Sequence, residues 1–429
     1  MFPQCKYSRE LLPWVGIWFL LGGSLQSEEN VETVNQLLSS IQDVGRDAVR
    51  GGYSRAVFTT PELDLRQWFV EQAQHRGLDV ETDRNGILWA WWGQPQEGAL
   101  VTGSHLDSVP GGGAFDGPLG VASALAAVDI LKSRGFQPPR SLAVTVFPEE
   151  EGSRFGVACL GSRLLTGAID TDKALNLRDV NGDTFADVAS ANGLDPRHMG
   201  PDPDAMARIG DFVELHVEQG KGLGQEGPAI AVGSSILGHG RWKISVSGQG
   251  NHAGTTLMTD RADPMVAAAQ IVLAIRETAA RQPDARATVG RLTPVPGGTN
   301  VIASRVDLWL DARHPDDAVT AQLIEGIYRA AQDVAAAEGC TVTLTEESYS
   351  DTVHFDAGLS RRITELLPGA PVLATGAGHD AGVLAGYVPS AMVFVRNPSG
   401  ISHSPEEYVA DEDASAGAVA LADVLEGLL

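Results

Sequence analysis

Two neighbouring stretches decide the fold class of this chain. Residues 99–134 read ALVTGSHLDSVPGGGAFDGPLGVASALAAVDILKSR, and residues 141–155 read SLAVTVFPEEEGSRF. Each begins with a short apolar run typical of a buried strand, Ala99–Ser104 and Ser141–Phe147, and the alanine-rich segment Leu119–Arg134 between them has a helical pattern. Buried strands that alternate with helices are typical of a parallel sheet covered by helices. We therefore predict an α/β fold with a central, mostly parallel sheet.

The same alternation continues on both sides of these stretches. Helices are predicted at Val31–Gly45 and Pro61–Arg76, and further strands at residues 86–92, 371–374 and 391–395. The acidic stretch Asp170–Asp211 has weak periodicity. We expect it to form helices and loops of the same α/β domain.

A different pattern begins after Gly220. It runs strand, helix, strand, strand, helix, strand, in the segments Arg241–Ser247, Asp263–Ala280, Ala287–Val295, Ser304–Asp311, Asp316–Glu338 and Thr341–Glu346. This β-α-β-β-α-β order predicts a ferredoxin-like unit, and later strand patterns place it inside the α/β domain. We expect residues 31–233 and 350–429 to form the discontinuous α/β domain and residues 234–349 to form the inserted unit.

Composition and charge limit the possible partners. The chain has 31 lysine and arginine residues against 55 aspartate and glutamate residues, which gives a net charge of −24. This acidic excess, without a basic cluster, argues against nucleic acid and anionic membranes as partners. Cys5, Cys159 and Cys340 are too few, and odd in number, for a disulfide framework. We therefore expect a cytoplasmic protein.

The N-terminus carries an apolar run, LLPWVGIWFLL at residues 11–21, that follows Lys6 and Arg9. Residues 1–24 therefore have the outline of a secretory signal, but the run is too short to span a bilayer as a helix, which needs about 20 residues. Glu10, Pro13 and the lack of a small-residue cleavage site argue against export. We expect residues 1–30 to be a disordered extension, and we keep export as the alternative.

The first chemical motif follows the strand Ala99–Ser104. It consists of His105 and Asp107, with Asp116 a little further on in a glycine-rich loop. An imidazole is a good ligand for a borderline divalent metal, and a nearby carboxylate can fix its tautomer. A lone histidine–aspartate pair is more often a surface pair. The loop glycines suggest a phosphate cradle, but the loop lacks both the lysine of a P-loop and a G-x-G-x-x-G pattern.

Three further motifs add histidines and carboxylates. Glu149–Glu151 follows the strand Ser141–Phe147, and adjacent carboxylates repel one another unless cations neutralise them. His216 stands in LHVEQG and His403 in GISHSPEE. Alone, the three glutamates would be a solvated acidic turn, and His216 would be a core histidine. Together with Asp116 they suit a two-metal hydrolytic site, in which ions about 3.5–4 Å apart share a bridging water or hydroxide.

The order of these motifs resembles the M20 family of metallo-aminoacylases and peptidases. The segments EEEGSRF, LHVEQG, NHAGTT, PGGTNVI, DAR, GAGHDAG and GISHSPEE are similar to its ureidohydrolase branch, which comprises N-carbamoyl-L-amino-acid hydrolases, β-ureidopropionases and allantoate amidohydrolases. The resemblance runs from about Gly51 to Tyr408. It implies that the α/β domain is a two-metal catalytic domain and that the inserted unit is a lid through which the chain forms a homodimer.

The resemblance also implies metal roles. One divalent ion would be bound by His105, Asp116 and His216, and a second by Asp116, Glu151 and His403, with Asp116 bridging. Zn²⁺ or Mn²⁺ is expected, and Co²⁺ or Ni²⁺ would also suit these ligands. Glu150 would be the general base, and Asp107 would support His105 from behind. A strained cis peptide is expected at Asp116–Gly117.

The substrate roles follow in the same way. His252 would stabilise the oxyanion, and Asn300 and Arg313 would bind the substrate carboxylate, the arginine through its bidentate fork. The expected substrate-binding residues are Gln219, His239, Asn300, Arg313, Gly400 and Ser402. His379 and Asp380 would lie behind the ligands. The chain reads Gly238-His239-Gly240-Arg241-Trp242 where allantoate-type enzymes commonly have Gly-Gln-Arg-Arg-Tyr, and Leu257 replaces a usual proline.

We therefore expect an amidohydrolase that removes the terminal ureido group of N-carbamoyl-L-amino acids, giving the L-amino acid, CO₂ and NH₃. Allantoate is the alternative substrate, and an M20 aminoacylase or dipeptidase is the third hypothesis. The loss of the Gln-Arg pair favours the carbamoyl amino acids. A non-catalytic metal-dependent binding protein could dispense with Glu150, so the presence of this residue argues against that class.

Overall fold

The computed structural model describes residues 32–429. The expected N-terminal extension and its signal-like run lie outside the described residues. Within the described range no helix is long and apolar enough to cross a membrane. The element bounds below apply to this range.

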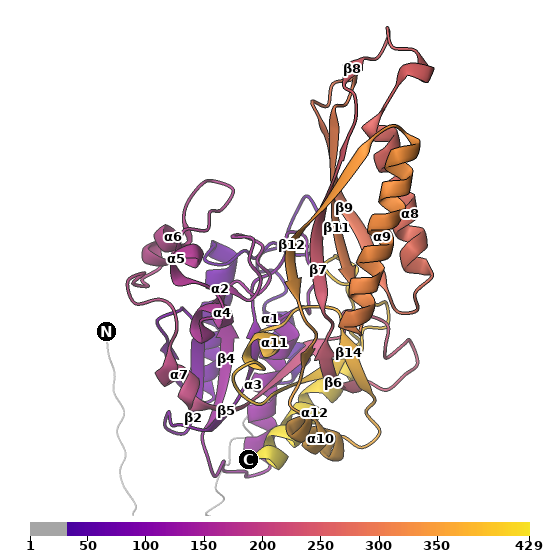
Figure 1. The fold of residues 1–429 in the computed structure, drawn as a ribbon. Coiled ribbons are helices and arrows are strands. Elements are labelled where there is room, and N and C mark those ends of the chain that lie inside the picture. The colour runs from indigo at the N-terminus through magenta and orange to yellow at the C-terminus, as the bar shows by residue number, and fades with distance from the viewer. Residues whose placement is uncertain (1–31) are drawn as a thin grey trace, which may run out of the picture. The chain divides into compact units, whose positions relative to one another are not determined.

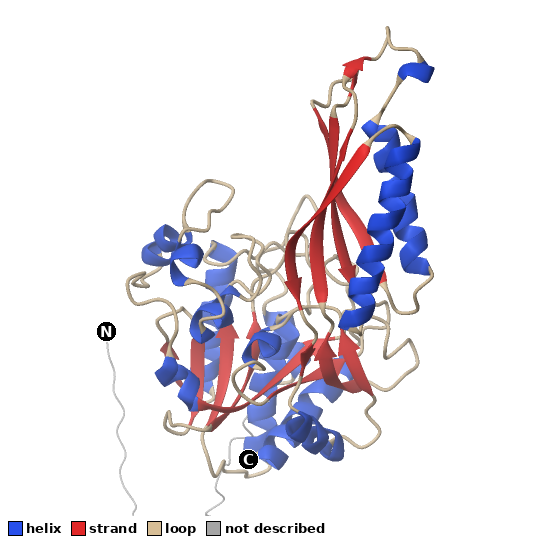
Figure 2. Ribbon diagram, in the orientation of Figure 1, coloured by secondary structure: helices blue, strands red, loops and turns tan. Residues whose placement is uncertain are grey.

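A nine-stranded sheet forms the centre of the α/β part of residues 32–429 (Figures 1 and 2). Its strand order is β1-β2-β4-β3-β5-β15-β6-β13, and β14 also pairs with β6. The strands β4, β3, β5 and β15 at its centre are mutually parallel. Outside them, β2 pairs antiparallel with β4 and with β1, β6 pairs antiparallel with β15 and with β13, and β14 pairs parallel with β6. The strand bounds are β1 Asp79–Thr82, β2 Leu88–Trp92, β3 Ala99–His105, β4 Leu142–Phe147, β5 Ile209–Val217, β6 Ile230–Ile236, β13 Val353–His354, β14 Val372–Thr375 and β15 Ser390–Val395. This confirms the predicted fold class.

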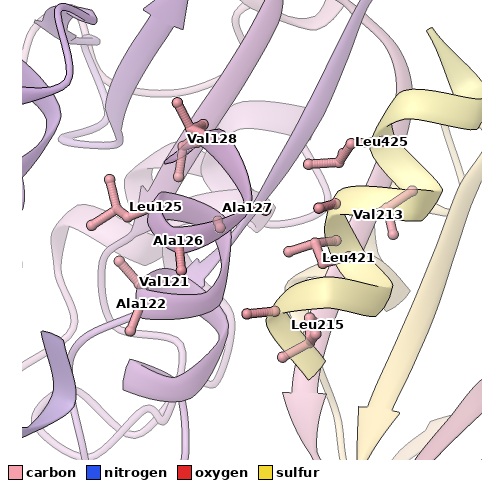
Figure 3. Packing of buried hydrophobic residues seen from close by; sticks show 14 of the residues in the cluster. Val121, Ala122, Leu125, Ala126, Ala127, Val128, Val213, Leu215, Leu421 and Leu425 are labelled. Atoms are coloured by element: carbon pink, nitrogen blue, oxygen red, sulfur yellow. The ribbon is translucent and has the colours of Figure 1, made fainter. Parts of the chain in front are cut away.

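Helices cover both faces of the sheet, and β3, β4 and β15 are therefore buried along their whole length. On one face, residues of α1 Val34–Ser40, α2 Thr60–His75, α3 Pro118–Ser133, α10 Ala357–Leu366 and α12 Asp411–Leu428 share one apolar cluster. Figure 3 shows residues of α3, β5 and α12 from this cluster. Gly120 allows close packing here, since a Cβ at this position would lie 2.3 Å from the carbonyl oxygen of Leu215. On the other face, residues of α4 Leu160–Thr166, α7 Pro203–Arg208 and α11 Asp380–Leu384 contribute to a second cluster.

The inserted unit contains a four-stranded antiparallel sheet with two long helices. Its elements are β7 His239–Ser247, α8 Pro264–Ala280, β9 Arg286–Val295, β11 Arg305–Arg313, α9 Asp317–Ala337 and β12 Thr341–Ser350. The sheet order is β12-β7-β11-β9. The predicted β-α-β-β-α-β succession is therefore present, and we call this unit the lid.

Several elements were not predicted. A separate pair of short strands, β8 Asn251–His252 and β10 Val301–Ile302, lies on connections within the lid. A 3₁₀ turn, η1, covers Met258–Asp260. The acidic stretch does contain helices, as expected, and they are short: α5 at Thr171–Leu175 and α6 at Phe185–Ala191. The first described helix is shorter than expected: α1 ends at Ser40, and turns follow it.

Candidate metal centre

The candidate ligands come from the ends of the central parallel strands. His105 is the last residue of β3, and His216 is the next-to-last residue of β5. Glu151 follows β4, Asp116 lies in the loop before α3, and His403 lies in the loop after β15. Parallel strands present their carboxyl ends at one edge of the sheet, where sites in α/β domains form. The fold therefore brings all five predicted ligands to one edge.

Asp116 is at the centre of this cluster. Its Oδ1 atom lies 3.5 Å from Nε2 of His105 and 3.2 Å from Nε2 of His216. Its Oδ2 atom lies 3.5 Å from Nε2 of His403, which is itself 3.3 Å from Oε2 of Glu151. The ligand atoms form two groups, each within 4.8 Å, made of His105, Asp116 and His216 and of Asp116, Glu151 and His403. One carboxylate thus presents a different oxygen to each group.

The charges of the cluster fit divalent cations. Burial raises the pKa of Glu150 and of Glu151 well above their usual range, and the charge of Asp116 adds to the effect on Glu151. The ion pairs of Asp116, Glu150 and Glu151 in the described part of the chain are all with histidines. Crowded, buried carboxylates with imidazoles and no arginine or lysine suit a bound cation, and this donor set suits Zn²⁺ or Mn²⁺.

A layer of residues behind the ligands fixes their orientation. The Nδ1 atom of His105 lies 3.1 Å from the carbonyl oxygen of Asp107, and Nδ1 of His216 lies 3.0 Å from that of Val217. Both rings therefore direct Nε2 toward Asp116, as metal-binding histidines commonly do. The Asp107 carboxylate also accepts hydrogen bonds from the backbone N–H groups of Glu150 (3.2 Å) and Glu151 (3.1 Å). Asp107 thus joins the histidine motif to the glutamate motif.

The three adjacent glutamates have three different environments. Glu149 has a left-handed backbone (φ 54°), and its Oε1 accepts hydrogen bonds from the N–H groups of Arg154 and Phe155. Glu150 is buried, with Oε2 3.6 Å from Nε2 of His105 and Oε1 3.3 Å from the Cys159 thiol, which donates to it. Glu151 lies beside His403. Of these three glutamates, Glu150 alone is at once buried, in contact with the cluster through His105 and outside both ligand groups.

The peptide bond after Asp116 is not as expected. Among residues 32–429 the cis bond is Val295–Pro296, so the predicted cis bond at Asp116–Gly117 is wrong. Gly117 is nevertheless required, because its φ is 85° and a Cβ there would lie 2.5 Å from the imidazole of His105. A turn with a positive φ at this glycine brings Asp116 under the histidine ring without a cis bond.

Some predicted substrate residues lie within the cluster. The Gln219 side-chain amide donates to Oδ2 of Asp116 (2.8 Å) and to Oγ of Ser402 (3.1 Å). Ser402 also donates to Oδ2 of Asp116 at 3.2 Å. Gly400 lies two residues earlier in the same loop, with a φ of 61°. These residues surround the side of the cluster that His403 occupies.

Arg313 and His239 lie at one end of the lid sheet. They are paired across β11 and β7. Two nitrogens of Arg313, Nε and Nη2, donate to the Asp311 carboxylate at 2.8 and 3.0 Å, and Nη1 donates to the carbonyl oxygen of Gly376 in the α/β part. Burial and the charge of Arg313 lower the pKa of His239. Arg313 therefore joins the lid to the loop that leads to His379.

His252 and Asn300 are not brought into the cluster. His252 lies on β8 and Asn300 precedes β10, and both side chains are exposed. The Nδ1 atom of His252 accepts a hydrogen bond from Gly254, and the carbonyl oxygen of Asn300 accepts one from Ala253. In this conformation of a single chain, the two residues are not part of the buried site.

Residues behind His216 form a buried polar group. The His379 ring packs edge-on against the His216 ring, with centroids 4.5 Å apart, and the Asp380 carboxylate accepts a hydrogen bond from Ser162. Sequence reasoning missed Glu214, which accepts hydrogen bonds from Ser104 (2.9 Å) and from the N–H of Ala381 (3.0 Å). A signal existed, since a glutamate two positions before a histidine in a strand lies on the same face.

The chain is similar to a known family and to proteins of named activity. The chain matches the family described as Peptidase family M20/M25/M40 over residues 101–427. It is 35% identical to the N-carbamoyl-L-amino acid amidohydrolase of Geobacillus stearothermophilus, over 91% of this chain and 96% of that protein. It is 32% identical to the allantoate amidohydrolase of Escherichia coli strain K12, over 92% of this chain and 97% of that protein. A hydantoinase/carbamoylase family amidase from Burkholderia multivorans superposes with a TM-score of 0.81 at 32% identity, covering 92% of this chain and 98% of that one.

Proposed function

This chain belongs to the peptidase M20 family of metal-dependent hydrolases and is an amidohydrolase, and we propose that it binds two divalent ions and removes the carbamoyl group of N-carbamoyl-L-amino acids. The products would be the L-amino acid, CO₂ and NH₃. Allantoate remains the alternative substrate.

The observation that carries the proposal is the arrangement around Asp116. Its two carboxylate oxygens face two separate ligand groups, which share no other residue. His105 and His216 would bind one ion with Asp116, and Glu151 and His403 would bind the other. Bound ions of this kind polarise a carbonyl and lower the pKa of water.

In this proposal Glu150 transfers the proton between the attacking water and the leaving nitrogen. Its carboxylate is buried beside His105 but belongs to neither ligand group. It would take a proton from the attacking water and deliver it to the departing nitrogen, as a general base and then a general acid. Burial raises its pKa, which increases its affinity for a proton when no cation is present.

The carboxylate of the substrate would bind to Arg313, and its ureido group would contact Gln219. In support, Gln219 donates to Asp116, and Arg313 on the lid donates to the carbonyl oxygen of Gly376, in the loop that leads to His379. His252 would stabilise the oxyanion and Asn300 would contact the carboxylate. Since these two are exposed on the lid, they must reach the cluster through lid closure or from a second copy of the chain.

The lid sequence favours a carbamoyl amino acid over allantoate. An arginine at position 240, as allantoate-type enzymes commonly have, does not fit beside the present Trp242. A Cβ on Gly240 would lie 2.2 Å from the indole of Trp242, which is buried in the lid core. His239 is the polar side chain that remains opposite Arg313. Allantoate carries a second ureido group that needs polar partners, whereas an apolar side chain needs none.

A homodimer formed through the lid, in the cytoplasm, is part of the proposal. Large apolar side chains of the lid are exposed in the single chain, namely Leu257, Met258, Val266 and Leu273. Monomers seldom expose such groups together, and they often mark a protein interface. The sparse cysteines suit a reducing compartment.

The test is a substrate panel on chelated and reconstituted enzyme, with ammonia release as the measure. Carbamoyl derivatives of Met, Phe and Ala are compared with allantoate at equal concentrations. We expect no activity after exhaustive chelation, recovery with Mn²⁺, Co²⁺, Ni²⁺ or Zn²⁺, and higher kcat/KM on a carbamoyl amino acid. Full activity without metal would overturn the mechanism. A preference for allantoate above tenfold, about 1.4 kcal/mol, would overturn only the choice of substrate.

A further inference from the structure

Glu407 joins two loops that each carry candidate ligands. It ends the segment GISHSPEE, four residues after His403, and its side chain reaches the glycine-rich loop that carries Asp116. One oxygen, Oε1, accepts hydrogen bonds from the backbone N–H groups of Phe115 (2.9 Å) and Asp116 (3.0 Å). The other oxygen, Oε2, is 3.4 Å from the hydroxyl of Ser402. A single buried carboxylate therefore connects residues almost 300 positions apart in the chain.

The glycine-rich loop is shaped to receive this carboxylate. A Cβ on Gly113 would lie 2.2 Å from Oε1 of Glu407, so any larger residue at position 113 would push the glutamate out. Glu407 is 5% exposed. No phosphate is needed to account for this glycine, because a carboxylate of the chain itself fills the space beside it.

The contacts of the Glu407 carboxylate among the described residues are with N–H and O–H groups rather than with a cation. Each partner belongs to a loop that carries a candidate ligand: the two N–H groups to the loop of Asp116, and the hydroxyl of Ser402 to the loop of His403. The contacts of Glu407 therefore set the position of one loop relative to the other.

We propose that Glu407 is a positioning residue that holds the Asp116 and His403 loops in the geometry that binds the second metal ion. This inference rests on the proposed two-metal function. Glu407 touches neither the substrate nor the reacting atoms; it acts through Asp116 and through the loop that carries His403.

The two ligand groups depend on Glu407 to different degrees. His105 and His216 lie on strands, and their side chains are 0% and 1% exposed. The His403 side chain is 50% exposed, on a loop residue whose φ is 57°, in the left-handed region that costs free energy for a non-glycine residue. The group of Asp116, Glu151 and His403 therefore needs outside support, and Glu407 supplies it.

The test compares E407Q and E407A with wild type and with E406Q. Glu406 is the matched control, because it is adjacent and exposed, and its side-chain bond within residues 32–429 is local, to Ser404. Metal content is measured by elemental analysis after dialysis against buffers of graded free Zn²⁺ or Mn²⁺. Melting temperatures are recorded with and without metal.

We expect wild type and E406Q to bind two ions with the same affinities. In E407A one ion should bind normally and the other about 10- to 100-fold more weakly, the usual effect of losing a residue that supports a ligand. E407Q keeps the size but loses the charge and should lie between the two. The metal-induced rise in melting temperature should shrink in both Glu407 variants. The metal-free melting temperature should not fall in E407Q, because its amide oxygen can still accept the N–H groups of Phe115 and Asp116, whereas E407A leaves them without this acceptor.

Three outcomes are decisive against the inference. Two ions bound with wild-type affinity in E407A would show that Glu407 does not position the site. Equal weakening of both ions, or a lower metal-free melting temperature in E407Q, would assign Glu407 a general structural role. Failure of the proposed function is distinct, because then wild type itself would not bind two ions at any concentration in the series.

Discussion

At the scale of single residues, adjacent identical side chains have separate tasks because the backbone turns between them. Glu149, with its positive φ, caps the N–H groups of residues 154 and 155. Glu150 faces His105 from a buried position, and Glu151 faces His403. The sequence reads EEE, and only the local geometry separates a loop-stabilising group from the proposed base and the proposed ligand.

The first prediction separates Glu150 from Glu151. Glu150→Gln removes proton acceptance but keeps the size, so kcat should fall by about 10²–10⁴ with metal content unchanged. Glu151→Gln should lose metal, because a neutral amide is a poorer ligand than a carboxylate. Steady-state kinetics and elemental analysis on the same preparations test this. An exchange of the two phenotypes would reverse the assignments.

The second prediction concerns Arg313 and the substrate carboxylate. Arg313→Ala should lower kcat/KM for the acid about 10- to 100-fold, since a hydrogen bond to a charged group contributes about 1.5–3 kcal/mol. Arg313→Lys should recover part of this loss, because a lysine cannot form the bidentate fork. Kinetics on a decarboxylated analogue, which should hardly change, complete the measurement.

The control for this prediction is Arg305→Ala. Arg305 lies on the same strand, β11, and pairs with Asp307 at 3.2 Å, but it has no contact with the α/β part among its described partners. An equal loss of activity in both variants would mean that the effect comes from the charge of the lid and not from recognition of the carboxylate.

At the scale of elements, the junction between β3 and α3 determines where the ligands meet. The strand ends at His105, and the helix begins at Pro118 after Gly117, whose backbone passes directly under the imidazole. The chain thus returns to the same histidine within a dozen residues. The position of Asp116 relative to His105 is a property of this junction and not of either element alone.

The third prediction tests this junction with two glycines of positive φ. Gly117→Ala adds strain of about 1–2 kcal/mol and also drives a Cβ into the His105 ring, so metal affinity should fall along with stability. Gly135→Ala, just after α3, has φ 72° and no atom within 4 Å of the new Cβ. It should lose a similar amount of stability and keep its metal. Urea unfolding and metal titration measure the two effects, and normal metal binding in the Gly117 variant would refute the argument.

At the scale of the whole described chain, the site is divided between two sheets. The candidate metal ligands lie at the edge of the nine-stranded sheet, while Arg313, His239, His252 and Asn300 belong to the lid. Arg313 already donates to Gly376 across the boundary. The remaining lid residues are exposed, so the site that would surround a substrate is incomplete in this conformation.

The fourth prediction is that substrate draws the lid toward the α/β part, because a closed site is needed to exclude water. The Glu150→Gln variant would bind substrate and turn it over slowly, which allows a stable complex. Small-angle scattering of this variant should show a smaller radius of gyration with a carbamoyl amino acid than without it. An unchanged radius at saturating substrate would contradict closure and leave the second copy of the chain as the source of His252 and Asn300.

The class of fold, the insertion and the candidate ligand set could be predicted from the amino-acid sequence. Apolar runs and helical periodicity are local properties, so the parallel sheet and the β-α-β-β-α-β unit could be predicted from short windows. His105, Glu151 and His216 could be found because the carboxyl ends of parallel strands gather at one edge. The order of the motifs then indicated the family.

The contacts between the loops, in contrast, become visible only in the folded chain. The contact of Glu407 with Asp116, the thiol of Cys159 on Glu150 and the link from Arg313 to Gly376 join residues that no local pattern relates. The motifs implied a cis bond at Asp116–Gly117, but the bond is trans. They also implied that His252 and Asn300 belong to the site, but in this conformation both are exposed on the lid. The physical reason is that periodicity reports which face of an element is buried, whereas the contacts between loops depend on how whole elements pack, and packing is not encoded in any single window of the chain.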